Sequence, residues 1–132
     1  MSAPLVLLYN LDTPKGAKIR RMCLPLKIRT RLVAKQEYGL PLSALIEGAA
    51  GAPVSEEVPD FDDELLLMAN FTGPQVDRFL QGFRRSHIPP VALKAVLTQT
   101  NRNWNSAALR AELLRERQAI QQGGSAHAAQ QD

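Results

Sequence analysis

The chain has little of what catalytic and metal sites are usually built from. Its 132 residues include one cysteine, two histidines and one tryptophan, and only 5% are aromatic. The single cysteine, Cys23, excludes an intramolecular disulfide and fits a reducing, cytoplasmic location. Cys23, His87 and His127 are scattered along the chain, which argues against a transition-metal site. We therefore predict no metal and no cofactor.

Long apolar runs and known catalytic motifs are also missing. The N-terminal apolar run ends at Tyr9 and has no basic region before it, so we expect neither a signal peptide nor a membrane span. The sequence contains no Gly-x-Ser-x-Gly motif and no glycine-rich phosphate loop. These absences favour a cytoplasmic binding protein without membrane contact over an enzyme.

The charged residues are unevenly distributed. A formal net charge of +3 is too small to indicate a protein that coats nucleic acid. The segment Lys15–Lys35 nevertheless contains eight Lys or Arg and no acid, whereas six acids cluster in residues 56–64. Arg29, Arg31 and Lys35 alternate along a predicted strand, so they point to one side of it, where phosphate contacts would form in a nucleic-acid complex. A charged edge strand exposed to water is the competing interpretation.

The hydrophobic pattern predicts four strands and four helices. The short apolar runs that predict strands are Leu5–Tyr9, Ile28–Ala34, Glu64–Ala69 and Leu93–Leu97. The segments with apolar residues at helical spacing are Pro14–Leu26, Leu42–Glu47, Pro74–Arg85 and Ser106–Gln121. In the last helix, the pattern places Leu109, Leu113, Leu114 and Ile120 on the inner side.

The two halves of the chain form an internal repeat. LLYNLDTP from Leu7 resembles LMANFTGP from Leu67, and GLPLSAL from Gly39 resembles NWNSAAL from Asn103. We predict a single domain over residues 1–120, built from two strand-helix-strand-helix repeats at about 4–47 and 64–120. An exposed acidic linker (48–63) joins the repeats, and a disordered tail (121–132) follows.

This repeat predicts an α/β (α+β) fold with a four-stranded ferredoxin-like sheet. The first and third strands are apolar at consecutive positions, so they belong in the centre with both faces covered. The short and terminal helices, or a second subunit, would then cover the second face. A small doubly wound parallel sheet is the alternative.

Several of these motifs together resemble an uncharacterised family of small bacterial proteins, the domain of unknown function 3783. The shared motifs are NLDTP near Asn10, EYGLPLSAL at Glu37–Leu45, NFTGP near Asn70, and LKAVLTQTN from Leu93 followed by Trp104. The likeness extends over nearly the whole chain, to about Ile120. It implies a small cytoplasmic α/β protein, and it carries over no catalytic residue because the family has no established activity.

The polar run TQTNRNWN (Thr98–Asn105) follows the fourth predicted strand. Trp104 and Leu109 have the spacing of a hydrophobic staple around an N-cap at Asn105, whereas TQTNRN has no close counterpart in the first half. The run is either a self-capped turn or a ligand site, since ligands often bind where a polar loop follows a strand. The binding residues predicted on the second interpretation are Lys94, Thr98, Thr100, Asn101, Asn103 and Trp104.

The leading hypothesis is a non-enzymatic binding or protein-interaction module that self-associates as a homodimer and has an unknown protein partner. One alternative is a nucleic-acid-binding protein that uses Lys15–Lys35, with Arg29, Arg31 and Lys35 as phosphate contacts. Another is an enzyme or small-anion binder at the Thr98–Asn105 loop.

Overall fold

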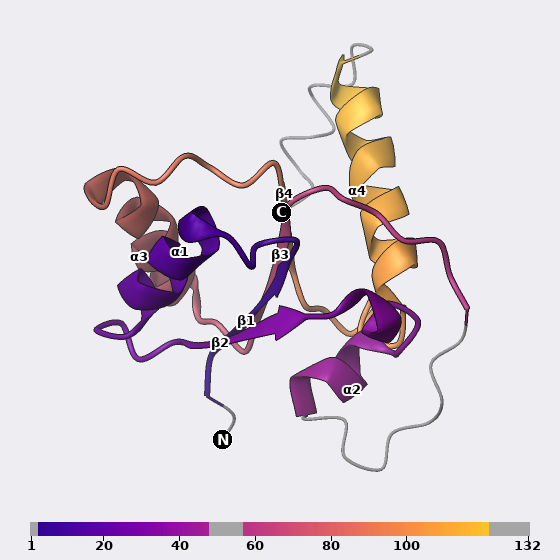
Figure 1. Ribbon diagram of the computed structural model, residues 1–132, viewed down its shortest axis with the longest axis horizontal. Helices are drawn as coiled ribbons and strands as arrows, with labels where there is room; N and C mark the ends of the chain where they lie inside the picture. The colour runs from indigo at the N-terminus through magenta and orange to yellow at the C-terminus, as the bar shows by residue number, and fades with distance from the viewer. Residues whose placement is uncertain (1–2, 48–56, 122–132) are drawn as a thin grey trace.

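The computed structural model describes residues 3–47 and 57–121. Four strands form one sheet in the order β2-β1-β3-β4, with bounds β1 Leu5–Tyr9, β2 Arg29–Val33, β3 Leu65–Ala69 and β4 Leu93–Val96. Four α-helices accompany them, α1 Pro14–Cys23, α2 Leu42–Glu47, α3 Gly73–Arg85 and α4 Ser106–Gln121, and a short 3-10 turn, η1, spans Lys35–Glu37. Helices α1 and α3 cover one face of the sheet, and α2 and α4 lie on the other (Figure 1).

The predicted elements are all present. The bounds of β1, α2 and α4 agree with the sequence prediction, and the other elements differ at their ends by one to three residues. Helix α1 begins behind Thr13, whose hydroxyl accepts the Gly16 N–H at 3.1 Å, and ends at Cys23 because the next residues form a turn. Helix α3 begins at a capping box in which Thr72 and Gln75 satisfy each other's backbone N–H groups.

The central position of β1 and β3 is confirmed, but the ferredoxin-like order is not. Strand β2 pairs parallel with β1, β4 pairs parallel with β3, and β1 is antiparallel to β3. In a ferredoxin-like sheet the outer strands are exchanged, so that β2 lies beside β3. Here α1 packs against β2 and is followed by a short connection, which returns the chain next to β1. The antiparallel β1–β3 pair also rules out the doubly wound parallel alternative.

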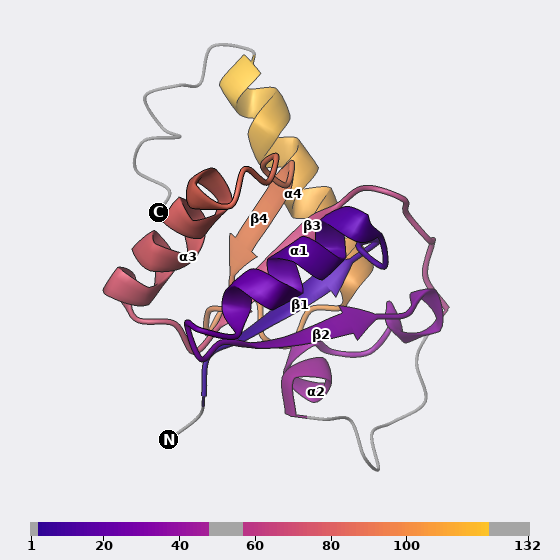
Figure 2. The ribbon, with the colours of Figure 1, turned by 60° about the vertical axis from the view of Figure 1, so that its left-hand side comes forward.

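Each face of the sheet has its own hydrophobic core. Because side chains alternate along a strand, Leu5, Leu7 and Tyr9 of β1 face α2 and α4, whereas Val6 and Leu8 face α1 and α3. Both β1 and β3 are buried at every position. The short and terminal helices thus cover the face for which a second subunit was the alternative (Figure 2).

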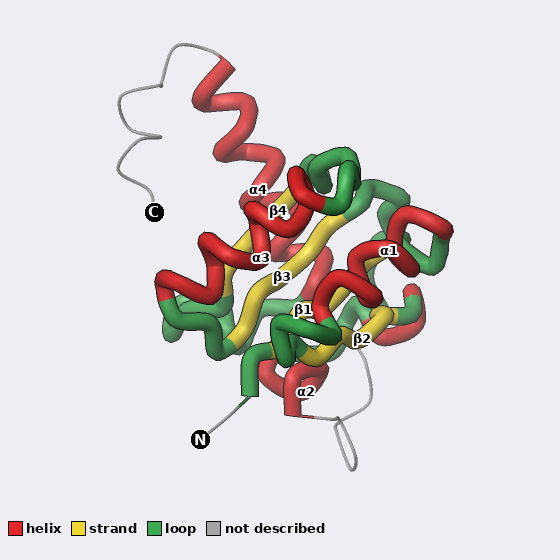
Figure 3. Tube along the Cα trace, turned by 90° about the vertical axis from the view of Figure 1, so that its left-hand side faces the viewer, coloured by secondary structure: helices red, strands yellow, loops and turns green. Residues whose placement is uncertain are grey.

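Two predictions about exposure need correction. Ile120 does not face inward: it is 45% exposed, because the last turns of α4 extend beyond the sheet (Figure 3). The predicted linker is not exposed throughout, since Phe61 is buried and stacks on Tyr38 with ring centroids 4.5 Å apart. Residues 48–56 of the linker and 122–132 of the predicted tail lie outside the described residues.

Candidate functional site

The turn after β4 is closed by its own side chains. Asn101 Oδ1 accepts the Thr98 N–H at 2.8 Å, and the Asn101 N–H donates to Thr98 Oγ1 at 3.1 Å. Asn101 Nδ2 donates to the Val96 carbonyl at 3.1 Å. The Asn101 side chain, only 8% exposed, therefore has both polar atoms bonded inside the turn. This geometry agrees with the self-capped turn that the sequence allowed.

This turn has a structural counterpart in the first half, which the sequence comparison missed. Glu37 Oε1 accepts the Ala34 N–H at 3.0 Å, and the Leu40 N–H donates to the Glu37 carbonyl at 3.0 Å. The Trp104 N–H donates to the Asn101 carbonyl in the same way at 2.9 Å. Glu37 thus makes the same two hydrogen bonds in the first half as Asn101 makes in the second. Because the two residues differ in type and length, a residue-by-residue comparison of the sequences does not reveal this equivalence.

Trp104 connects the turn to the start of two helices. Asn105 caps α4, because its Oδ1 accepts the Ala108 N–H at 2.8 Å, and Trp104 and Leu109 pack in the same core cluster as the staple prediction requires. The Trp104 carbonyl accepts the N–H of Leu42, the first residue of α2, at 2.8 Å. The backbone of Trp104 is therefore held by hydrogen bonds at both its N–H and its carbonyl.

A cavity of about 770 Å³ lies beside this turn, at the edge of the sheet. Five of the six predicted binding residues line it: Lys94, Thr98, Thr100, Asn101 and Trp104. Asn103, the sixth, is exposed and is not part of the lining. The remaining walls come from β3 and β4 and from helices α3 and α4, through Met68, Ala95, Val96, Val76, Leu80, Leu109, Glu112, Leu113 and Glu116. We call this cavity the β4 cleft.

The β4 cleft runs along a strand whose outer side is unpaired, since β4 is the last strand of the sheet. The Leu97 N–H donates to the Met68 carbonyl of β3 at 2.8 Å, so alternate residues, Lys94 and Val96, direct their backbone groups to the open edge. Val96 is also 44% exposed, unusual for a large apolar side chain on a strand. The Val96 carbonyl is already taken by Asn101 Nδ2, so the groups left facing outward are the Lys94 backbone and the Val96 N–H, beside apolar surface.

Two carboxylates give the cleft a negative wall. Glu112 and Glu116 follow each other on one side of α4, and Glu112 is paired with Arg115 at 2.7 Å. Burial, and next the neighbouring Glu112, raises the pKa of Glu116 above its ordinary value. No ion pair of Glu116 is found within residues 3–47 and 57–121. Lys94, across the cleft, donates to the Val91 carbonyl at 3.0 Å.

Sequence reasoning did not find these carboxylates or the α3 wall. The signal was present, because Leu109, Glu112, Leu113 and Glu116 recur at the spacing of a single helix face. Acids on a face otherwise used for packing indicate that the face is partly open. Val76 and Leu80 of α3 pack against the core and are only partly buried.

The predicted phosphate contacts on β2 have other partners. Arg31 pairs with Glu37 at 2.7 Å and also donates to the Leu45 carbonyl at 2.8 Å. Lys35 forms an ion pair with Asp62. Arg29 alone is exposed without an ion pair to another described residue. Only Arg29 and Arg31 thus lie on β2, since Lys35 belongs to η1, and Arg31 and Lys35 hold the loops.

Other predicted features of the chain are structural. Cys23 is buried in the α1–α3 core, and burial raises the pKa of its thiol to about 12. In the described part of the chain, no three His, Cys, Asp or Glu residues lie close enough together to hold a metal ion. Within the same part, no helix has the length and hydropathy needed to cross a bilayer.

The fold and the cleft define a small α/β structure of three layers, with a groove along an edge strand of the sheet. Residues 64–120 match the model of a family described as a domain of unknown function, DUF3783. The resemblance predicted from the motifs is thus confirmed for the second half of the chain. Comparisons with curated proteins and with solved structures gave no significant match.

Proposed function

We propose that the protein is a non-enzymatic protein-interaction module whose β4 cleft binds an extended segment of a partner protein. The observation that carries this proposal is the location of the cleft along the unpaired side of β4, between α3 and α4. An extended segment placed there would pair its backbone with Lys94 and with the Val96 N–H, and insert alternate side chains into the apolar walls.

The charges of the cleft indicate what kind of segment fits. Glu112 and Glu116 line it against a single cation, Lys94, so a small anion would meet net negative charge. A Lys or Arg side chain of the partner would instead complement Glu116. The Thr98 and Asn101 side chains each accept the backbone N–H of the other residue, which supports a structural role for them and leaves recognition to the walls.

A partner segment explains the cleft better than a second copy of the chain does. Self-association was expected because both faces of the central strands had to be covered, and α2 and α4 supply that cover within one chain. Pairing of two β4 edges remains the competing outcome of the experiment below.

We also infer that the chain contains two copies of one strand-helix-strand-helix unit. Residues 60 positions apart have matching backbones: Asn10 and Asn70 are left-handed, with φ of 59° and 64°, as are Lys27 and His87, with φ of 60° and 55°. Leu7 pairs directly with Leu67, as an approximate two-fold axis between equivalent strands requires. The family match, over residues 64–120, spans one such unit.

The duplication has a functional consequence, because the two units differ at the position that lies in the β4 cleft of the second unit. Arg31 lies on β2 where the second unit has Ala95 on β4, and its guanidinium bridges Glu37 and the Leu45 carbonyl. A large ion-paired side chain thus stands where the second unit has a small one. We expect one binding cleft per chain, at β4.

Selection of peptides from a random displayed library of about 12 residues tests the proposed function. We expect enrichment of sequences that alternate apolar residues and include Lys or Arg, with binding followed by the fluorescence of Trp104. Val96→Lys should weaken binding of a selected peptide at least about tenfold, roughly one lost pocket contact. Ile120→Lys is the matched control, because Ile120 is equally exposed and does not line the cleft.

Equal binding to the wild-type chain and the Val96→Lys variant would overturn the assignment of the cleft, and so would a library that yields no binder. Light scattering at micromolar concentrations distinguishes the remaining outcome. A dimer that Val96→Lys dissociates and Ile120→Lys leaves intact would identify the occupant as a second copy of the chain.

A further inference from the structure

The layer formed by α1 and α3 has an excess of positive charge, whereas the rest of the chain has an excess of negative charge. Residues 14–27 and 73–87 contain eight of the 16 Lys and Arg but only one of the 13 Asp and Glu. The remainder of the chain consequently has more acids than bases. The net charge of +3 does not reveal this uneven distribution. The fold produces it, because the two basic segments are distant in sequence but lie side by side in the structure (Figure 2).

The cations on this layer are available to a partner. Their side chains are exposed, and none forms an ion pair with another described residue; they are Lys18, Arg20, Arg21, Lys27, Arg78, Arg84 and Arg85. We call these seven residues the basic face. Six other cations are ion-paired, one of them in the same layer: Lys15, Arg31, Lys35, Arg102, Arg110 and Arg115.

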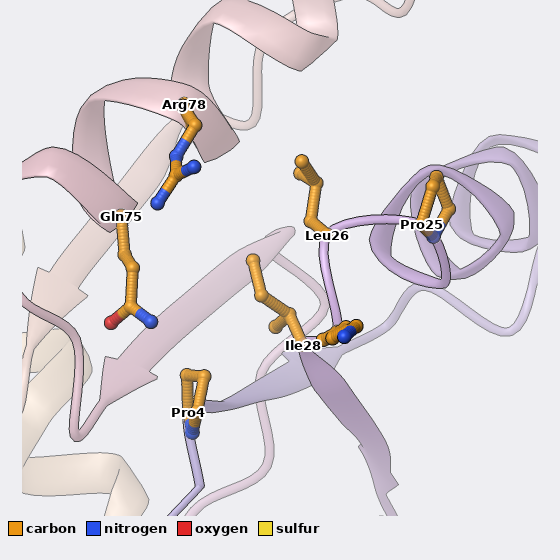
Figure 4. A pocket seen from close by; sticks show the side chains of 7 residues that line it. Pro4, Pro25, Leu26, Ile28, Gln75 and Arg78 are labelled. Atoms are coloured by element: carbon orange, nitrogen blue, oxygen red, sulfur yellow. The ribbon is translucent and has the colours of Figure 1, made fainter.

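A cavity of about 420 Å³ lies within this region, between the first turns of α3 and the connection from α1 to β2. Lys27 and Arg78 line it together with the Gln75 amide, and no acid is among its lining residues. Figure 4 shows that the Arg78 and Gln75 side chains extend from α3 toward the space opposite Leu26 and Ile28. Two cations and an amide around one hollow are the groups that recognise a phosphate oxygen.

We propose that the basic face binds the phosphate backbone of a double-stranded nucleic acid without reading its sequence, with one phosphate seated between Lys27 and Arg78. This surface is separate from the β4 cleft and does not depend on the function proposed for it. It shares Lys18, Arg20, Arg21 and Lys27 with the Lys15–Lys35 segment of the sequence-based hypothesis, but not the phosphate contacts expected there, Arg29, Arg31 and Lys35.

The composition of the face favours a duplex over other polyanions. Single-stranded nucleic acids are usually bound by exposed aromatic side chains that stack on the bases. Here Phe79 and Phe83 of α3 are buried against the sheet, and α1 has no aromatic residue. Insertion into an anionic membrane requires a row of exposed apolar side chains, whereas this face offers Leu24 alone, at 73% exposed.

Fluorescence anisotropy with labelled duplexes of about 20 base pairs tests the proposal, over a salt series from about 25 to 200 mM. The full chain should bind both duplex DNA and duplex RNA, and log K should fall linearly with log salt. The Lys27→Gln/Arg78→Gln variant should bind about tenfold more weakly at low salt, and its salt slope for DNA should be shallower by up to about two.

The matched control is Arg115→Gln/Arg117→Gln, which removes the same charge from exposed positions of α4, in the opposite layer. It should change the affinity less than about twofold. Absence of binding at the lowest salt, or an equal loss in both variants, would overturn the proposal. Binding to vesicles of phosphatidylcholine and phosphatidylserine without binding to either duplex would overturn it in favour of a membrane surface. Circular dichroism of both variants checks that they remain folded.

Discussion

The hydrogen bond between Tyr9 and Ser106 gives the most quantitative prediction from this structure. The Tyr9 hydroxyl lies 2.7 Å from Ser106 Oγ, and both side chains are fully buried, at 0% exposure. The bond joins the end of β1 to the first residue of α4, 97 positions later in the sequence. The perturbation is the set of three variants Tyr9→Phe, Ser106→Ala and the double substitution.

Each single substitution leaves one hydroxyl without its partner in a dry core, which should cost about 2 kcal/mol of the free energy of unfolding. The double variant removes both polar groups, so its cost should also be about 2 kcal/mol rather than the sum of the two. Tyr38→Phe is the control, because the Tyr38 hydroxyl makes only a long bond of 3.4 Å to Asn10 Oδ1. It should cost less than about 0.5 kcal/mol.

Urea unfolding followed by the fluorescence of Trp104, the only tryptophan, measures all four variants. A coupling energy of about 2 kcal/mol between Tyr9 and Ser106 is expected. Additive effects of the two substitutions would refute the reasoning, since they would mean that the hydroxyls are satisfied independently. A Tyr38→Phe cost as large as that of Tyr9→Phe would refute it as well.

Three further predictions concern stability. Gly16→Ala should lower the free energy of unfolding by more than about 3 kcal/mol, because the new Cβ would lie 1.6 Å from the Leu11 carbonyl oxygen. Thermal unfolding measures this loss, and a near-neutral effect would contradict the close approach of the two segments. Lys27→Gly and His87→Gly should each raise the free energy of unfolding by about 0.5 kcal/mol in urea titrations, because both positions have left-handed φ angles. If one substitution stabilised the protein and the other destabilised it, the two positions would not be equivalent. Burial raises the pKa of the Cys23 thiol to about 12. The contribution of the thiol to stability is therefore complete below about pH 8.5 and is lost as the pH rises toward 12. From about pH 8.5 to 10, the unfolding midpoint of the Cys23→Ala variant should fall less steeply than that of the wild type.

The local elements were predictable from the sequence, but the order of the outer strands was not. Periodic apolar residues identified every helix and strand, and the uniform burial of β1 and β3 identified the central pair. A ferredoxin-like sheet and the observed sheet share that central antiparallel pair and differ only in which neighbour β2 takes. Burial patterns cannot distinguish them, because β2 is an edge strand in both.

The candidate site was predictable from the sequence only where its residues are neighbours along the chain. Lys94, Thr98 and Trp104 are near in sequence, so the polar run pointed to the cavity they line. The opposite walls depend on how α3 and α4 pack around the edge of β4, which no local pattern encodes. The role of Glu37 as the counterpart of Asn101 was hidden because side chains of different length accept the same backbone hydrogen bond.

Backbone amide mapping of β4 tests the central claim most directly. On addition of a peptide selected against the full chain, the amide resonances of Lys94 and Val96 should shift in nuclear magnetic resonance spectra, and their hydrogen exchange should slow. That result would mean that an extended segment pairs with the edge of the sheet. Shifts confined to the α1–α3 layer, with the exchange of Lys94 and Val96 unchanged, would contradict the claim that the β4 cleft is the binding site.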